Sequence, residues 1–410
     1  MNGGTARKGW VRVAWRAAVV AAAAACALRL AGPAWVAGLV PMLSPFNALL
    51  AAAAGAGALV LLGAGAAAAA CVFSPRFFCR WLCPSGACQD AVSALVKRRP
   101  WVGRVPRAGV GLLFVALGAA LAGYPLFGWL DPLVLFNAAF GAAKKHPGSL
   151  DWIAAAGLPA LLVLALAAPG LWCRRLCPLG ALQDVLRLSL RRWEASGAGA
   201  ARGGNGRAQA TEDAAREQEI AAVGRRAFLG LGLGAGYRLA LPPGREPAAP
   251  VIRPPGSGPS SRFTRLCVRC GACVRACPSK ILRLGGAGTG WAGVLAPEVC
   301  FEDDYCLEAC RSCGQACPSG AIRRFTLENK HARPMGLAKV DHERCILGAS
   351  RECGACVNAC PYEALDLEWN PVELVSRVTV DAKKCTGCGY CEYVCVTTPR
   401  SIVVNPPREG

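Results

Sequence analysis

Four dense cysteine motifs lie in the last third of this chain of 410 residues and restrict its fold more than any other feature. Of its 24 cysteines, 19 fall in Cys-x-x-Cys or Cys-x-x-x-Cys runs. Side chains three or four positions apart are too close for a typical disulfide framework, but they suit a shared metal or cluster. The four motifs are Cys267, Cys270, Cys273 and Cys277; Cys306, Cys310, Cys313 and Cys317; Cys345, Cys353, Cys356 and Cys360; and Cys385, Cys388, Cys391 and Cys395.

The first and fourth motifs have the spacing of bacterial [4Fe–4S] ferredoxins. In that pattern three close thiolates bind one cubane and the more distant cysteine reaches the neighbouring cluster, so motifs work in pairs. Zinc accepts the same ligands and is the competing interpretation of any single set. Four consecutive sets favour four [4Fe–4S] clusters. The segments KILRL, GAIRRF, EALDLE and SIVVN predict strands after the motifs, so residues 263–410 are expected to form a tandem α+β bacterial-ferredoxin-like domain of two double-cluster units.

The second and third motifs depart from this spacing. Cys306 and Cys310 are one residue further apart than the matching pair of the first motif, and the segment ILGASRE separates Cys345 from Cys353. Such changes alter the solvent cover and hydrogen bonding of cluster sulfurs, which tune the reduction potential. Cys300 lies outside the spacing and is either a spare thiol or a replacement for Cys306.

Residues 1–192 are expected to form an α-helical membrane domain. Four segments in it are long enough to span a bilayer core, which takes about 20 helical residues. Buried helices of a soluble bundle would show a polar face, and the second to fourth segments show almost none. The segments are roughly 13–40, 47–73, 108–130 and 152–172.

Positive charge is concentrated in this membrane part. The net charge is +20; residues 1–260 hold 27 Lys and Arg against 10 Asp and Glu, and residues 261–410 hold 19 against 16. A nucleic-acid binder would carry its basic residues on the soluble module, so nucleic acid is excluded as a partner. The loops opposite the basic ones carry only Lys144, Lys145 and His146. The positive-inside rule therefore predicts a cytoplasmic N-terminus in a multi-pass protein of the bacterial inner membrane.

An internal repeat joins the two halves of the membrane domain. FCRWLCPSGACQD (78–90) returns as WCRRLCPLGALQD (172–184), and PMLSPFNALL (41–50) resembles WLDPLVLFNAAF (129–140). Two such copies, related by an axis along the membrane normal, would bring four thiols together at the cytoplasmic boundary. These are Cys79, Cys83, Cys173 and Cys177.

We hypothesise that these four thiols hold a fifth [4Fe–4S] cluster, whose charge Arg80, Arg174 and Arg175 would offset. A redox-active dithiol or disulfide pair and simple helix-end packing are the alternatives. The other cysteines of this part lack repeat partners and are expected in the membrane core. They are Cys26, Cys71 and Cys88.

Three segments connect the two parts. Residues 193–224 are Gly/Ala-rich and then charged, as in a flexible linker. Residues 225–243 begin with Arg225 and Arg226 before an apolar, Gly-rich stretch. They predict a twin-arginine export signal or a fifth anchor, with a short cytoplasmic amphipathic helix as the alternative. Residues 244–262 are expected to be a Pro/Gly tether. Export would place the four-cluster domain in the periplasm.

The motif order resembles known families. The last 150 residues or so, with the twin-arginine-like segment ahead of four cysteine motifs, resemble the MauM/NapG family of ferredoxin-type proteins. The membrane part, with two Cys-x-x-x-Cys-Pro motifs, is similar to the NapH family. This chain departs from both patterns because it fuses them. The cytoplasmic two-cluster tail that is usual in the NapH type is replaced here by the four-cluster domain. The resemblance implies electron delivery from the membrane quinone pool, as quinol, to a periplasmic oxidoreductase such as a nitrate-reductase-type partner.

Several classes of cofactor and chemistry are not indicated. The chain has no Cys-x-x-Cys-His and only three histidines, none in a predicted span, which argues against c-type haem and bis-His haem b. No acid–base or nucleophile constellation is visible, so a substrate-converting site is not evident and whether the chain is an enzyme stays open. If quinol is oxidised on it, Asp131, Lys144, Lys145 and His146 are candidates to take its protons. A solvated loop explains them equally well.

The main hypothesis is a membrane-anchored iron–sulfur protein that passes electrons from quinol, or from a cytoplasmic donor, to a periplasmic oxidoreductase or carrier. An accessory or maturation factor for a partner metalloenzyme is a second hypothesis, and a redox sensor is a third.

Overall fold

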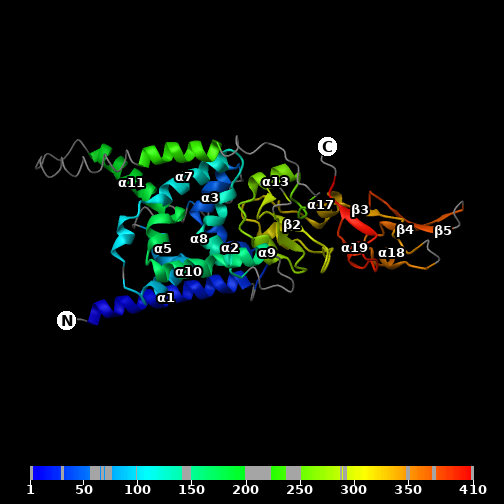
Figure 1. Ribbon diagram of the computed structural model, residues 1–410, viewed down its shortest axis with the longest axis horizontal. Coiled ribbons are helices and arrows are strands. Elements are labelled where there is room, and N and C mark those ends of the chain that lie inside the picture. Colours follow the sequence, from blue (N-terminus) through cyan, green and yellow to red (C-terminus); the bar gives the residue numbers. More distant parts are fainter. Residues whose placement is uncertain are drawn as a thin grey trace, which may run out of the picture.

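The computed structural model describes residues 3–28, 32–55, 76–97, 99–140, 149–198, 223–236, 251–286, 293–347, 351–371 and 375–407, with the single residues 65, 69 and 289. Figure 1 shows three parts in a row: a helical bundle and then two small α+β units. The N-terminus lies at the end of the bundle that is remote from these units.

The helices of the bundle follow the sequence repeat. The first copy contains α1 (Gly3–Leu28), α2 (Val36–Met42), α3 (Pro45–Ala53), α5 (Phe77–Trp81) and α6 (Pro84–Ser93). After the turn η1 (Pro100–Arg104), the second contains α7 (Ala108–Leu121), η2 (Leu126–Leu130), α8 (Pro132–Ala138), α9 (Ser149–Ala155), α10 (Gly157–Ala167), the π-helical turn η3 (Trp172–Leu176) and α11 (Pro178–Ala198).

Equivalent positions of the two copies have the same local structure. Ser44 and Asp131 cap α3 and α8, each just before a proline at the first helical position, where no backbone N–H is needed. The Ser44 hydroxyl also donates a hydrogen bond to the Asp131 carboxylate and so joins the copies. In the same way α6 packs against α1 and α8, and α11 packs against α7 and α3. This reciprocal packing agrees with the expected repeat.

The four expected membrane spans are found only in part. Among the described residues, two helices are long and apolar enough to cross a bilayer, Trp10–Leu28 and Leu150–Ala167. The pair α2 and α3, bent by 87°, makes a third if it counts as one span. The predicted span over 13–40 is confirmed only in part, as Trp10–Leu28. Its helix ends at Leu28, and Gly32, with a φ of +96°, lies just before Pro33 ahead of the separate α2.

The predicted span over 108–130 is also shorter in the structure. The segment 108–130 contributes only the 14 residues of α7, because Gly123, with a φ of +87°, and Pro125 follow that helix. Most of the predicted segment 47–73, including Cys71, lies outside the described residues.

A further helix, residues 223–236, lies along α7. A Cβ on Gly234 would lie 2.2 Å from the carbonyl oxygen of Val115, and one on Gly118 would lie 2.5 Å from that of Leu231. Phe228 is 79% exposed, and Leu229 and Leu233 also point outward. Close contact through small residues four positions apart, here Gly230 and Gly234, is typical of helix pairs in membranes.

The first α+β unit contains α13 (Ser260–Leu266), α14 (Ala272–Ala276), β1 (Leu282–Leu284), β2 (Pro297–Val299), α16 (Ser312–Ala316) and α17 (Leu327–Ala332). Strands β1 and β2 are antiparallel, with Leu282 opposite Val299.

The segment GAIRRF of this unit was predicted as a strand, and this was wrong. The N–H of Arg323 within it donates to the carbonyl oxygen of Gly256. Gly256 belongs to the stretch expected to be a tether. From Val251 on, that stretch packs against the unit, and its Ile252 accepts a hydrogen bond from the N–H of Val299.

The second α+β unit contains β3 (Leu337–Val340), α18 (Ala355–Ala359), β4 (Leu365–Asn370), β5 (Val375–Val380), α19 (Tyr390–Tyr393) and β6 (Ile402–Asn405). Strand β3 pairs antiparallel with β6, and β4 pairs antiparallel with β5. The strands predicted from EALDLE and SIVVN are β4 and β6.

The first unit docks directly on the bundle, at the end remote from α5 and α11 (Figure 1). Helices α14 and α16 contact α2, and the alanines of these three helices share one apolar cluster. A Cβ on Gly38 would lie 2.2 Å from the carbonyl oxygen of Ala316. The buried Arg275 donates to the carbonyl oxygens of Ala37 (3.2 Å) and Asn137 (3.4 Å). Both copies of the repeat therefore hold the first ferredoxin unit.

Candidate iron–sulfur sites

The first unit assembles two sets of thiols, each from two motifs. Cys267, Cys270 and Cys273 all interact electrostatically with Cys317, the last cysteine of the second motif. The reciprocal set joins Cys277, the last cysteine of the first motif, to the other three thiols of the second. These three are Cys306, Cys310 and Cys313. The arrangement is the exchange expected for a double-cluster ferredoxin.

The second unit shows a similar arrangement. Cys391 interacts with Cys385 and Cys388, and Cys388 interacts with Cys360 of the third motif. The remaining thiols of the third motif, Cys345 and Cys353, interact with Cys356. Cys395 packs in the same apolar cluster as Cys356.

The chemistry of these sets fits [4Fe–4S] clusters. Burial raises the pKa of Cys273 and of Cys313 well above the usual range, and neighbouring thiolates raise it further. Closely spaced thiolates that are buried or half-buried therefore need a compensating cation, which cluster iron would supply when it is bound.

Backbone N–H groups point at two of the sulfurs. Ile322 donates to Cys317 Sγ and Ala364 to Cys360 Sγ, both at 3.4 Å. In the part of the chain that the structure describes, no group of three or more His, Cys, Asp or Glu is arranged to hold a single metal ion. A [4Fe–4S] cubane does not need ligands that converge on one ion, because each of its thiolates binds a different iron atom.

The second motif's longer spacing has a structural counterpart that the sequence did not indicate. The buried Lys330 donates from Nζ to the carbonyl oxygens of Leu307 (2.5 Å), Glu308 (3.0 Å) and Cys310 (3.1 Å). It therefore holds the loop with the additional residue in place. It also brings a positive charge beside Cys306, with which it interacts.

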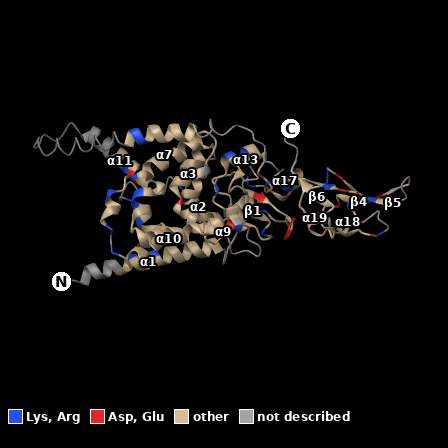
Figure 2. Cartoon of the chain, in the orientation of Figure 1, with Lys and Arg blue, Asp and Glu red and all other residues tan. Residues whose placement is uncertain are grey.

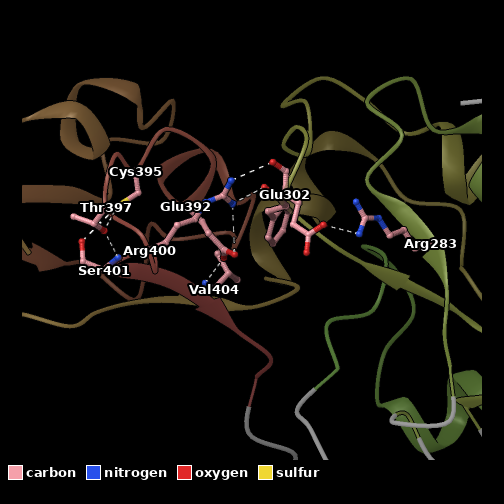
Figure 3. Close-up of polar contacts among 9 residues, drawn as sticks. Arg283, Glu302, Glu392, Cys395, Thr397, Arg400, Ser401 and Val404 are labelled. Atoms are coloured by element: carbon pink, nitrogen blue, oxygen red, sulfur yellow. Dashed lines mark hydrogen bonds and ion pairs between the residues drawn. The ribbon is translucent and has the colours of Figure 1, made fainter. Parts of the chain in front are cut away.

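Two hydroxyl groups lie beside Cys395, where Val396 stands instead of the usual proline (Figure 3). The Oγ atoms of Thr397 and Ser401 lie 3.2 and 3.4 Å from Cys395 Sγ. Burial alone would raise the pKa of this thiol, but the hydrogen bonds from Ser401 and Thr397 lower it to about 7. Hydrogen bonds to a ligand sulfur are one means by which a protein sets a cluster's potential.

The two units are joined next to their cysteines. The N–H of Cys306 donates to the carbonyl oxygen of Cys388 (2.9 Å), and the rings of Tyr305 and Tyr390 stack with centroids 3.8 Å apart. Arg400 reaches across the same boundary and donates to the carbonyl oxygens of Phe301 (2.7 Å) and Glu302 (3.1 Å) (Figure 3). The second and fourth motifs are therefore in backbone contact.

The four repeat cysteines of the helical bundle converge. Cys83 and Cys177 each interact electrostatically with Cys79 and Cys173. The contacts are reciprocal between the copies: Gln183 Nε2 donates to Cys79 Sγ (2.9 Å), and Cys173 Sγ donates to Gln89 Oε1 (3.3 Å). The fifth-cluster hypothesis required this meeting of four thiols, although ligation itself stays a prediction.

The charges around these thiols were only partly anticipated. Arg80, Arg174 and Arg175 border a cleft of about 950 Å³ that reaches Cys79 and Cys173. Sequence reasoning missed a further arginine, Arg76. It pairs with Asp184 (2.8 and 2.5 Å), donates to the carbonyl oxygen of Cys173 (2.8 Å) and interacts with Cys79 and Cys177. The Gln-Asp pair that ends both repeat copies was the available signal for Gln89, Gln183 and Asp184.

The structure describes only some of the other residues that the sequence singled out. Asp131 was expected on the outer loop, which was wrong: it is fully buried and caps α8. Lys144, Lys145 and His146 lie outside the described residues. Cys26 and Cys88 pack against the bundle core, and Cys300 is half-buried beside Arg283 and Glu302, apart from the four sets. Arg225 and Arg226 lie in the 223–236 helix.

Paired cysteine sets in two small α+β units define an iron–sulfur electron-transfer protein of ferredoxin type. Family models agree. One described as "4Fe-4S dicluster domain" matches residues 266–321, 308–364 and 344–398, and one described as "4Fe-4S binding domain" matches 56–101 and 150–196. The chain belongs to the MauM/NapG family of ferredoxin-type proteins.

Three relatives illustrate the similarity. The methylamine utilization ferredoxin-type protein MauM of Methylobacillus flagellatus is 38% identical over 174 residues, 40% of this chain and 72% of the relative. The ferredoxin-type protein NapG of Escherichia coli is 36% identical over 215 residues, 49% of this chain and 86% of the relative. The ferredoxin-type protein NapF of Escherichia coli is 32% identical over 145 residues, which cover 35% of this chain and 79% of the relative. No solved structure matches.

Proposed function

We propose that this chain takes electrons from quinol, or from a cytoplasmic donor, and passes them through four [4Fe–4S] clusters to a periplasmic oxidoreductase. The docking of the first unit on the bundle carries this proposal, because it sets Cys270 against the membrane helices. The contact between Cys306 and Cys388 then continues the route into the second unit. When bound, the clusters supply one-electron transfer, and the chain's own residues fix their order and surroundings. The name of the MauM relative, a methylamine utilization protein, makes an amine-oxidising system one candidate class of partner. A nitrate-reductase-type partner, which the resemblance in motif order implies, is the other.

The proposed fifth cluster lies at the other end of the bundle. The convergence of Cys79, Cys83, Cys173 and Cys177 supports it, as does the "4Fe-4S binding domain" model that matches around both motifs. It is the point at which a cytoplasmic donor would deliver electrons in a fusion of NapH type.

The proposed orientation places the N-terminus and these four thiols in the cytoplasm, and the four-cluster domain in the periplasm. Figure 2 shows Lys and Arg gathered at the bundle end that carries α5 and α11, away from the ferredoxin units. By the positive-inside rule, this distribution supports a cytoplasmic location for that end of the bundle. We place the 223–236 helix in the membrane as a retained fifth anchor, because its exposed Phe228, Leu229 and Leu233 are apolar and its glycines fit α7.

Exchange of Gly234 for leucine is expected to destabilise the membrane domain by about 1–3 kcal/mol, because the new side chain overlaps the backbone of Val115. The matched control is Gly232→Leu, since a Cβ on Gly232 meets nothing within 4 Å. The melting temperature and the yield of full-length protein in membranes measure the effect. Equal behaviour of the two variants, or a mature chain that begins after residue 236, would exclude a retained anchor.

The proposed function predicts that a short-chain menaquinol reduces the clusters in isolated membranes under anaerobic conditions. Bleaching of the cluster absorbance and the appearance of paramagnetic signals measure this reduction, and a reporter fused after Gly410 shows the side of the membrane. Clusters that dithionite reduces but quinol does not would favour the accessory, maturation or sensing alternatives.

A further inference from the structure

A cavity of about 350 Å³ lies where the first ferredoxin unit meets the bundle. Its membrane wall is formed by apolar residues of α8, α9 and α10, such as Leu135 and Ala154. Its opposite wall is the loop of the first cysteine motif, with Cys270 and Val274. Ligand pockets begin at about 300 Å³, so one aromatic ring with part of a side chain fits this space.

The cavity borders the lipid side of the bundle. Helices α9 and α10 form the candidate span Leu150–Ala167, of which only 17% is buried within the protein. Ile153 lines the cavity and is itself 65% exposed, and its neighbour Trp152 also faces outward. An apolar molecule dissolved in the bilayer can therefore reach the cavity without crossing water.

Three charged side chains interrupt the apolar lining. Asp151, Arg269 and Arg275 are all buried. Arg269 is fixed by the carbonyl oxygens of Val294 and Cys267, both at 2.9 Å. Arg275 is fixed by Ala37 and Asn137, but its Nε has no hydrogen-bond partner among the described residues. An unpaired buried polar atom such as Arg275 Nε is costly, and a ligand with polar groups would lower that cost.

A molecule that fits this cavity therefore has an apolar body and a few polar atoms, and it would lie beside Cys270. A phospholipid acyl chain matches the apolar wall but offers no polar atom to Arg275 Nε. A quinol ring matches the apolar wall and also carries hydroxyl groups, whose oxygen can accept a hydrogen bond from Arg275 Nε.

We propose that this cavity binds the ring of a membrane quinol next to the thiol set of Cys267, Cys270, Cys273 and Cys317, which rests on the function proposed above. Oxidation of the quinol to the quinone breaks two O–H bonds and releases two protons and two electrons. Asp151, the carboxylate among the lining residues, is placed to take the protons one at a time and release them to water. The two thiol sets of the first unit would hold two [4Fe–4S] clusters, and such clusters, each a one-electron acceptor in its oxidised form, would supply the places for the two electrons.

The test fills the cavity with Ala154→Trp in the full-length protein. The matched control is Ala160→Trp, at an exposed position further along α10. In the wild type, a photoreactive azidoquinone should label peptides that contain Ile153 or Val274. Labelling and the rate of quinol-dependent cluster reduction should fall at least tenfold in Ala154→Trp and stay unchanged in Ala160→Trp. Reduction by dithionite should be equal in all three proteins.

A second variant separates binding from proton transfer. Asp151→Asn should keep the azidoquinone label while slowing quinol-dependent reduction, and Asp151→Glu should restore part of the rate. A label that maps elsewhere, or a co-purified phospholipid that quinone does not displace, would overturn the assignment. If quinol fails to reduce the wild-type clusters, quinol is not the donor and that part of the proposed function fails. If it reduces wild type and Ala154→Trp equally fast, only the cavity assignment fails.

Discussion

Replacing Cys317 with alanine should remove the cluster next to the membrane bundle, although Cys317 belongs to the second motif. Its thiol interacts with Cys267, Cys270 and Cys273, so its loss leaves that set with three ligands. Iron should fall by about four atoms per chain, one cubane's worth. Quinol-dependent reduction of the remaining clusters should almost stop, since the proposed first acceptor is lost. Iron analysis, paramagnetic resonance and anaerobic absorbance measure these changes.

Because the two motifs exchange their last cysteine, variants in different motifs should lose the same cluster. The spectrum of Cys317→Ala should match that of Cys270→Ala, and the spectrum of Cys277→Ala should match that of Cys313→Ala. Cys300→Ala is the control, because this thiol lies apart from the four sets and should cost no iron. If Cys317→Ala instead resembles Cys313→Ala, the motifs do not exchange their last ligand.

Combined alanine substitution of Cys79 and Cys173 should also lower the iron content by about four atoms per chain. One thiol from each repeat copy is removed, so neither copy can complete the set that the structure brings together. The signals of the ferredoxin units should persist, because these units lie at the bundle end remote from α5 and beyond it (Figure 1).

The control for this pair is Cys26→Ala with Cys88→Ala, two core cysteines without repeat partners. Unchanged iron in the Cys79 and Cys173 variant would refute the fifth cluster. A disulfide found among the four thiols of the wild type would then favour the redox-active dithiol.

Sequence reasoning reached the ferredoxin units because cluster ligation is largely local. Three of the four thiols of a set lie within a few residues of one another, and spacing alone indicates that the last one crosses to the partner motif. Strands β4 and β6 were equally accessible from their apolar pattern. The segment GAIRRF was not, because Arg323 pairs with Gly256, about 70 positions earlier in the chain, and no local pattern encodes that contact.

In the helical bundle, too, some features could be predicted from the sequence and others depend on tertiary contacts. The repeat correctly anticipated that Cys79, Cys83, Cys173 and Cys177 would meet. Helix ends were missed where glycine and proline interrupt apolar runs, since hydropathy does not register backbone conformation. Arg76, Lys330 and the cavity beside Cys270 depend on tertiary packing, so only the structure identifies them.

The docking of the first unit has a consequence for how such a protein can arise. Arg275, Gly38 and Ala316 hold the unit on the bundle through contacts of their own, and none belongs to the stretch between α11 and the 223–236 helix. Peptide continuity is therefore not what keeps the two modules associated. The same surfaces suit two separately synthesised subunits, and a gene fusion between them would mainly fix their stoichiometry at one to one.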